Sequence, residues 1–168
     1  MSDLSALDRQ AFVERFGGVF EHSPWVAEAA YDAGIAAGTA TADGLHGQLV
    51  AALRAGTEER QRALINAHPD LAGRLARAGQ LTADSTKEQA SAGLDQLTDA
   101  ERSLFTELND AYKAKFAMPF IMAVKGRSKD EILAAFRTRL THDPAQEFAT
   151  ALAEIERIAL LRLKDMLP

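Results

Sequence analysis

The sequence predicts an all-α fold, and three observations support this prediction. Apolar residues recur at helical spacings of three and four, helix start and stop signals follow one another along the chain, and alternating β-branched runs of strand length are absent. The 168 residues can bury one sizeable core but are too few for two ordinary domains. We therefore expect a single domain over residues 1–168, built as a bundle of about eight helices.

Four helices are predicted between residues 23 and 79. Three of them begin at a residue whose side chain can accept hydrogen bonds from the first turn, and they end at a glycine or before a proline. The expected ranges are Ser23 to Gly34, Asp43 to Gly56, Thr57 to His68, and a short helix around Leu71 to Ala78 that closes at Gly79.

The second half of the chain carries three Ser/Thr-x-x-Glu boxes, a pattern in which two side chains satisfy backbone N–H groups at a helix start. The boxes are Ser85/Glu88, Thr98/Glu101 and Ser128/Glu131, and Asp143-Pro144 starts the last helix. The helix that starts at Thr98 should reach Phe116 and is broken by Pro119. Its buried face is expected to consist of Leu104, Phe105, Leu108 and Tyr112.

The composition argues against several classes of function. A formal net charge of −5 leaves no large basic surface, so no nucleic-acid partner is expected. The absence of cysteine excludes disulfides, thiolate nucleophiles and Cys-ligated metals, and it fits a reducing cytoplasm. No signal peptide and no bilayer-spanning segment is recognisable, so we expect a cytoplasmic protein without membrane contact. The four histidines lack metal-ligand spacing, and no metal is expected.

His68 stands directly before Pro69, where a helix should end and the chain should turn. An imidazole fixed at such a point can act as a general acid or base when the next helix brings a carboxylate beside it. A histidine at a helix end more often interacts only with the helix dipole, and this reading stays open for His68. For the other histidines, His22, His46 and His142, we expect only such a structural role at a helix end.

Glu88 also has two readings. A capping box headed by Ser85 explains a glutamate at this position without any function. However, Glu88 has Gln89 as its neighbour and lies one short helix away from His68, so its carboxylate can be the one that meets the imidazole. The residues alone leave both readings open.

Arg162 lies inside the apolar face of the last predicted helix. This face consists of Phe148, Leu152, Ile155, Ala159, Arg162 and Met166. Because a guanidinium stays protonated, a buried one needs an anion or several acceptors beside it. That anion is either a core carboxylate, which would make Arg162 structural, or a ligand.

The apolar run Phe120, Ile121, Met122, Ala123 and Val124 is too short for a helix and is stopped by Gly126. We expect it to form a buried extended connector. Such a run is more often core than pocket, although an apolar wall with backbone donors suits a small planar ligand.

In their order and spacing, these residues resemble the OHCU decarboxylase family, whose members convert 2-oxo-4-hydroxy-4-carboxy-5-ureidoimidazoline (OHCU) to (S)-allantoin in urate degradation. The resemblance covers nearly the whole chain. Its marks are His68-Pro69-Asp70-Leu71, Leu81-Thr82, Ser85-x-x-Glu88-Gln89, Ala92-Gly93-Leu94, Leu108-Asn109-x-x-Tyr112, Phe116, Pro119-Phe120-Ile121-x-Ala123-Val124-x-Gly126, Ile132-Leu133 and Arg162-Leu163.

The resemblance implies an all-α carboxy-lyase that uses no cofactor. The family is often dimeric, which makes a homodimer one candidate assembly. The catalytic residues that it implies are His68, Glu88 and Arg162. The implied substrate contacts are Pro69, Ser85, Gln89 and the segment Phe120 to Val124.

The rival interpretation is a non-catalytic helical module that binds a small ligand or a partner helix through the same pocket. The joint presence of His68, Glu88 and Arg162 favours the enzyme. Accelerated conversion of fresh substrate to optically active allantoin would discriminate between the two.

Overall fold

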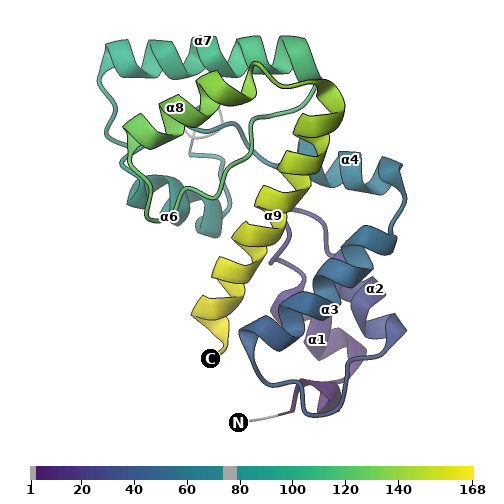
Figure 1. Cartoon of the computed structure of the whole chain (residues 1–168). Helices are drawn as coiled ribbons and strands as arrows, with labels where there is room; N and C mark the ends of the chain where they lie inside the picture. The colour runs from purple at the N-terminus through teal and green to yellow at the C-terminus, as the bar shows by residue number, and fades with distance from the viewer. Residues whose placement is uncertain (1–2, 74–78) are drawn as a thin grey trace. The chain divides into compact units, whose positions relative to one another are not determined.

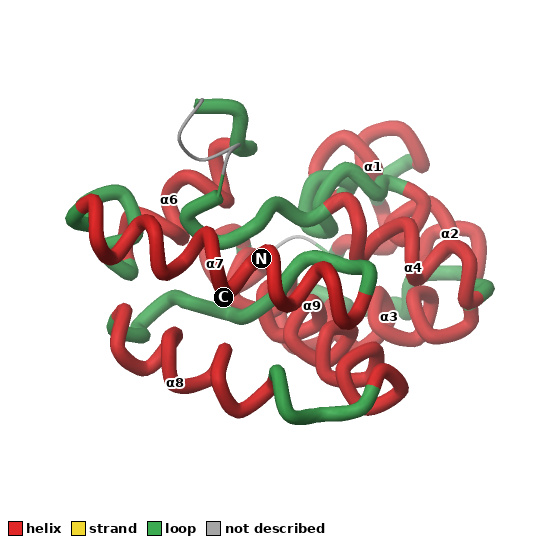
Figure 2. Tube along the Cα trace, turned by 90° about the horizontal axis from the view of Figure 1, so that it is seen from above, coloured by secondary structure: helices red, strands yellow, loops and turns green. Residues whose placement is uncertain are grey.

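Helices make up all of the regular secondary structure in the parts of the chain that the structure describes, residues 3–73 and 79–168 (Figure 1, Figure 2). Within these ranges the computed structural model contains eight α-helices, one 3₁₀ helix and no strand. The predicted all-α class and number of helices are confirmed for these residues. The extent of the domain, residues 1–168, stays a prediction.

The contacts along the chain group into two compact units, which we describe separately. The N-terminal unit comprises the residues up to Ala67 together with Glu156–Pro168, and the central unit comprises His68–Ile155. Helix α9 (Pro144–Met166) contributes its first part to the central unit and its last part to the N-terminal unit.

The N-terminal unit contains η1 (Leu4–Ala6), α1 (Arg9–Phe16), α2 (Trp25–Ala33), α3 (Ala42–Ala55) and α4 (Glu58–Ala67). Helix α2 packs against both α1 and α3. The core includes five fully buried side chains, Phe12, Phe16, Leu45, Leu49 and Leu53. Gly56 follows α3 at a point where a Cβ would lie 2.8 Å from the Trp25 ring, so a larger residue would displace the indole.

The central unit contains α6 (Ala83–Ser91), α7 (Asp99–Phe116), α8 (Lys129–Arg139) and the first part of α9. Helices α7 and α8 pack against each other (Figure 1). The core includes four fully buried aromatic side chains, Phe105, Tyr112, Phe120 and Phe136. The rings of Phe120 and Phe136 are stacked with their centroids 3.7 Å apart. This stacking anchors the segment between α7 and α8 in the core.

Several predicted helix starts are confirmed. The boxes Thr98/Glu101 and Ser128/Glu131 are both formed, each with two reciprocal hydrogen bonds. Asp143 caps α9 by accepting a hydrogen bond from the N–H of Gln146 at 2.8 Å. Helix α4 ends at Ala67, as the following His68-Pro69 predicts.

Two predicted helix starts are wrong because the capping residue lies earlier in the chain, and a third is wrong because Ser23 does not cap α2: its hydroxyl donates to the carbonyl of Glu21 at 2.9 Å. Helix α3 is capped by Thr41, two residues before Asp43, through the N–H of Gly44. Helix α6 begins two residues before Ser85 and is capped by Thr82, whose hydroxyl accepts the N–H of Ser85 at 3.2 Å. In both cases an earlier threonine supplies the acceptor, and a side-chain oxygen is all that a cap requires.

Some predicted burial also differs. Leu104 and Leu108 are only half-buried, whereas the polar Asn109 is 3% exposed. Met166, at the end of the apolar face of α9, is 38% exposed. The helix predicted around Leu71 to Ala78 lies largely outside the described residues.

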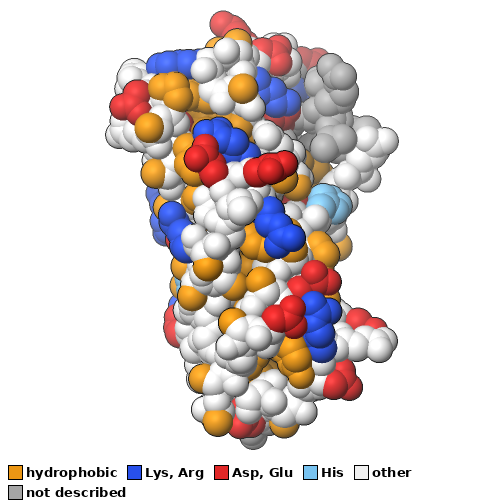
Figure 3. All heavy atoms as spheres, turned by 90° about the vertical axis from the view of Figure 1, so that its right-hand side faces the viewer, with side chains coloured by type: hydrophobic (Ala, Val, Ile, Leu, Met, Phe, Trp, Pro, Cys, Tyr) orange, Lys and Arg blue, Asp and Glu red, His pale blue; other side chains and the backbone are white. Residues whose placement is uncertain are grey.

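Acidic and basic side chains are interspersed on the face shown in Figure 3. Among the described helices, none is both long enough and apolar enough to cross a membrane.

Candidate active site

His68 is the first residue after α4 and the first residue of the central unit. Its side chain is buried, with 8% exposed, and Pro69 is half-buried. The segment from residue 68 to residue 72 belongs to no helix. The position of His68 therefore depends on the side chains that hold this segment.

Gln89 holds the segment through both ends of its side-chain amide. Its Oε1 accepts a hydrogen bond from the N–H of Ala72 at 2.9 Å, and its Nε2 donates to the carbonyl of Asp70 at 3.4 Å. Gln89 is 6% exposed, and buried polar groups of this kind are normally paired. These two bonds tie α6 to the segment that carries His68, a structural role that the sequence did not predict for Gln89.

Helix α7 holds the same segment from a second element. Asn109 donates from Nδ2 to the carbonyl of Leu71 at 2.8 Å. One turn later, Lys113 Nζ lies 2.5 Å from Oδ2 of Asp70. Residues four apart share one face of a helix, so this face of α7 supports the segment after His68.

Helix α6 carries three of the predicted site residues, Ser85, Glu88 and Gln89. Ser85 and Gln89 are buried and four residues apart, and Glu88 is half-buried. Because Thr82 caps the helix, Ser85 is already in its first turn and Glu88 is not part of a capping box. The purely structural reading of Glu88 as a capping residue is therefore wrong.

A cavity of about 300 Å³ lies beside α6 within the central unit. Its lining includes Ala72, Thr86, Gln89, Leu94 and Arg102. Its volume is at the lower end of the range for small-molecule pockets. Gln89 thus contributes both to this cavity and to the support of the segment after His68.

The predicted buried connector is confirmed between α7 and α8. All five residues from Phe120 to Val124 are buried, and none belongs to a helix or strand. Two side chains hold its backbone: Arg139 Nη1 donates to the carbonyl of Ile121 at 2.5 Å, and Glu154 Oε2 accepts the N–H of Ala123 at 3.0 Å.

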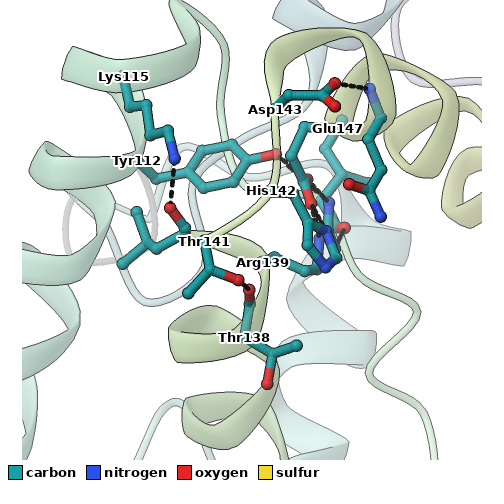
Figure 4. Close-up of polar contacts among 11 residues, drawn as sticks. Tyr112, Lys115, Thr138, Arg139, Thr141, His142, Asp143 and Glu147 are labelled. Atoms are coloured by element: carbon teal, nitrogen blue, oxygen red, sulfur yellow. Dashed lines mark hydrogen bonds and ion pairs between the residues drawn. The ribbon is translucent and has the colours of Figure 1, made fainter.

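Arg139 belongs to a buried polar cluster that Figure 4 shows in close-up. The carboxylate of Glu147 has no exposed surface and accepts hydrogen bonds from Tyr112 Oη at 2.5 Å and Arg139 Nε at 2.9 Å. His142 Nδ1 lies 2.9 Å from the same carboxylate. The guanidinium of Arg139 also lies over the Phe120 ring, 4.3 Å from its centroid.

Burial and hydrogen bonding within this cluster shift two pKa values. Burial raises the pKa of Glu147, but the hydrogen bonds from Arg139 and Tyr112 outweigh it and leave the pKa below its ordinary value. Burial and donation to Glu147 raise the pKa of the Tyr112 hydroxyl. Glu147 is thus a buried carboxylate that is stabilised in its charged form.

Sequence reasoning missed Arg139 and Glu147, although a signal for Arg139 was available. Arg139 follows Phe136 by three residues and Ile132 by seven, which places it on the apolar face of α8. A guanidinium at this position needs an anion or several acceptors beside it, for the same reason as Arg162 does.

Arg162 lies in the N-terminal unit and is 6% exposed. Its Nη1 lies 2.9 Å from Oε2 of Glu21, which is 2% exposed, and donates to the carbonyl of Val19 at 3.1 Å. The buried guanidinium thus has the anion that its position required, and this anion is a carboxylate of the protein. The other predicted site residues, from His68 to Val124, lie in the central unit.

The remaining histidines have other contacts or surroundings. His46 Nε2 lies 2.8 Å from the carbonyl oxygen of Glu156, and His22 is an exposed residue with φ of 47°. Among the described residues, no three or more His, Asp or Glu side chains form a group that could hold a metal ion.

Comparisons with known proteins place these residues in context. The family model described as OHCU decarboxylase matches residues 5–164. The chain is 40% identical over 166 residues to 2-oxo-4-hydroxy-4-carboxy-5-ureidoimidazoline decarboxylase of Halalkalicoccus jeotgali, covering 99% of this chain and 90% of that protein. It is 39% identical over 165 residues to the protein of the same name from Haloferax volcanii, covering 98% and 94%.

A solved structure gives the same picture. The crystal structure of an (S)-allantoin synthase superposes with a TM-score of 0.76 at 31% sequence identity and covers 98% of this chain. The chain spans 52% of the length of that synthase. Together with the family model, which covers nearly all of the sequence, these similarities establish that the chain belongs to the OHCU decarboxylase family.

Proposed function

We infer that this chain is a carboxy-lyase that decarboxylates OHCU to (S)-allantoin in urate degradation. The observation that carries the inference is the match of the OHCU decarboxylase family model to residues 5–164. Two relatives named for this reaction, each similar over nearly the whole chain, support it. The structural similarity to an (S)-allantoin synthase supports the product.

The substrate contains the electron sink that decarboxylation needs. Carbon 4 of OHCU carries a hydroxyl and a carboxylate, and carbon 5 carries the ureido group and is doubly bonded to a ring nitrogen. When the bond from carbon 4 to the carboxylate breaks, CO₂ leaves, its electron pair forms a double bond to carbon 5, and the ring nitrogen takes a proton. Carbon 5 then gains a proton while the hydroxyl loses one, which creates the carbonyl of allantoin. The protein has to orient the substrate and move protons, and it needs no cofactor as an electron sink.

His68 is proposed as the general acid/base that handles the proton at carbon 5 after CO₂ has left. Its burial and the bonds that hold the segment after it support this role, because proton transfer to one face of a ring requires a fixed donor. Delivery to a single face would produce one enantiomer of allantoin.

Glu88 is proposed to hydrogen-bond the substrate hydroxyl or a ring N–H and so to orient or polarise it. Its half-buried position on α6, without a capping function, supports this role. Pro69, Ser85 and Gln89 are proposed as substrate contacts. The backbone of the segment Phe120 to Val124 is proposed to form hydrogen bonds with the ureido group and the edge of the ring.

Arg162 is proposed to bind an anionic or carbonyl oxygen of the substrate. The family resemblance at Arg162-Leu163 supports this role. The contact with Glu21 would hold the guanidinium in a fixed orientation, and it also offers a purely structural alternative. Replacing both members of the pair tests which role applies.

The function is tested with freshly generated OHCU, by following its decay in absorbance and the appearance of (S)-allantoin by circular dichroism. The wild-type chain should accelerate both. His68→Asn should remain folded and lose about 10²–10⁴-fold in turnover, as expected when a general acid/base is removed. A wild-type chain that leaves the decay rate unchanged would instead support a non-catalytic ligand-binding module.

The compartment and the assembly are also proposals. A cytoplasmic location is supported by the absence of cysteine, and a homodimer by the frequent dimers of the family. Cell fractionation tests the first, and light scattering coupled to size-exclusion chromatography tests the second.

A further inference from the structure

We propose that Arg139 and Glu154 are positioning residues that aim the backbone N–H and C=O of Met122 at the substrate, so that Met122 reads an amide-like edge of the ureido group or ring. This inference rests on the proposed function, because it assumes that the segment Phe120 to Val124 contacts the substrate. It adds two side chains that the family resemblance does not single out.

Arg139 fixes the peptide group before Met122. Its carbonyl belongs to Ile121, and Arg139 Nη1 donates to that oxygen at 2.5 Å. Since the described chain contains no cis peptide bond, the N–H of Met122 points opposite to the carbonyl in the same rigid plane. Fixing the Ile121 oxygen on Arg139 therefore directs the N–H of Met122 away from Arg139.

Glu154 fixes the peptide group after Met122. Its N–H belongs to Ala123 and donates to Glu154 Oε2 at 3.0 Å. By the same planar geometry, the carbonyl of Met122 is directed away from Glu154. The two bonds together fix both peptide planes next to one residue, and they set the directions of one donor and one acceptor.

Arg139 is itself held in place. Its guanidinium is bonded to the fully buried Glu147 (Figure 4). It also lies over the Phe120 ring. A guanidinium is a planar fork of donors, so anchoring one side of it on Glu147 sets the direction of the N–H groups on the other side. The Ile121 carbonyl thus meets a donor that is oriented in advance.

The ligand chemistry follows from this geometry. A residue that presents one N–H and one C=O complements a group with an adjacent carbonyl and N–H, which is the edge of a urea, an amide or a cyclic imide. The ureido group and the ring of OHCU both have such edges. Binding of this kind is equal in the ground state and the transition state, so its loss should raise KM more than it lowers kcat.

The principal test uses Glu154, because this side chain is only half-buried and its replacement should not unfold the protein. Glu154→Leu removes the acceptor for Ala123 and should raise KM about tenfold while kcat changes less than about twofold. Glu154→Gln retains a carbonyl acceptor and should restore KM to near the wild-type value. Equal KM values for the Leu and Gln variants would overturn the proposal.

A matched control lies two residues further along α9. Glu156 is bonded to Arg54 in the N-terminal unit, and Glu156→Leu makes the same substitution in the same helix without touching the connector. Its KM should equal that of the wild type. Arg139→Lys keeps the charge beside Glu147 but not the fork, and it should raise KM as Glu154→Leu does. A rise in KM for Glu156→Leu as large as that for Glu154→Leu would contradict the assigned role.

A binding measurement separates failure of this inference from failure of the proposed function. The chain has four methionines, so ¹⁵N-methionine labelling gives a small set of amide signals. Added (S)-allantoin should shift the Met122 amide in the wild type and much less in Glu154→Leu. An unmoved Met122 amide in an active enzyme would overturn only this inference, whereas an inactive wild type would overturn the proposed function.

Discussion

Replacing Arg162 with methionine, first alone and then together with Glu21, separates the two roles of this buried guanidinium. Methionine has a similar length and fits the apolar face of α9, so the packing around position 162 should be largely kept. The substitution nevertheless leaves the carboxylate of Glu21 without the guanidinium that lies 2.9 Å from it. The Tm of the single variant therefore measures mainly the loss of stability that results when this carboxylate stays buried without its partner.

The structure sets the expected magnitude. Glu21 is 2% exposed and Arg162 is 6% exposed, so both charges are almost completely removed from water. Breaking such a pair by removing one partner costs about 3–5 kcal/mol. For a chain of 168 residues, the usual entropy of unfolding converts this cost into a fall in Tm of about 8–14 °C.

The double variant Glu21→Leu/Arg162→Met removes both charges together. Its Tm should recover most of the loss, because apolar replacement of a whole buried pair is often neutral. The carbonyl of Val19 still loses its donor, which leaves a deficit of about 1–3 kcal/mol. The assay is a thermal melt and an OHCU turnover measurement on the same folded sample.

The result for the double variant decides the role of Arg162. A stable but inactive double variant supports substrate binding by Arg162. A stable double variant with wild-type turnover would refute substrate binding and leave a structural pair. A single variant that melts with the wild type would refute the energetic reasoning itself.

Three further predictions follow from the structure. Glu88→Gln should change stability by less than about 0.5 kcal/mol, since Glu88 caps no helix, yet reduce turnover strongly; wild-type rates would remove Glu88 from the site. Gly73→Ala would place a Cβ 2.6 Å from Cβ of Asp70, so the segment after His68 must shift. The free energy of unfolding, measured by thermal melts, should fall by about 1–3 kcal/mol. Turnover should fall by more than this loss of stability explains, and unchanged kinetics would contradict the prediction. Because the pKa of Glu147 is lowered, its contribution to stability is present above the ordinary value of 4.5 and is lost as the pH falls through the lowered folded value. Glu147→Gln should therefore show a shallower acid loss in denaturant titrations, and identical acid profiles would count against the assignment.

Local signals predicted the fold well because helix periodicity and capping depend on neighbouring residues. The two boxes at Thr98 and Ser128 were predicted correctly. The box at Ser85 was not, because Thr82 offers an equivalent hydroxyl three residues earlier. A pattern of residue types cannot show which of two nearby hydroxyls caps a helix when both fit its start.

The site was predicted only as far as single residues allow. The position of Arg162 on the apolar face of its helix predicted that it needs an anion, but Glu21 lies far away in the sequence and carries no local signal. The support of the connector by Arg139 and Glu154 likewise depends on tertiary contacts between separate helices. Charge and periodicity identify which side chains need partners, and only packing identifies the partners.

The two bonds of Gln89 also limit how often the segment carrying His68 can leave its place. Opening the segment away from α6 would strand the N–H of Ala72 or the amide of Gln89 in a buried setting, at a cost of about 1–3 kcal/mol. This cost restricts the open form to roughly 0.6–18% of the closed form. The imidazole therefore keeps this position for most of the time, and the protection of the Ala72 amide against hydrogen exchange would measure how often the segment opens.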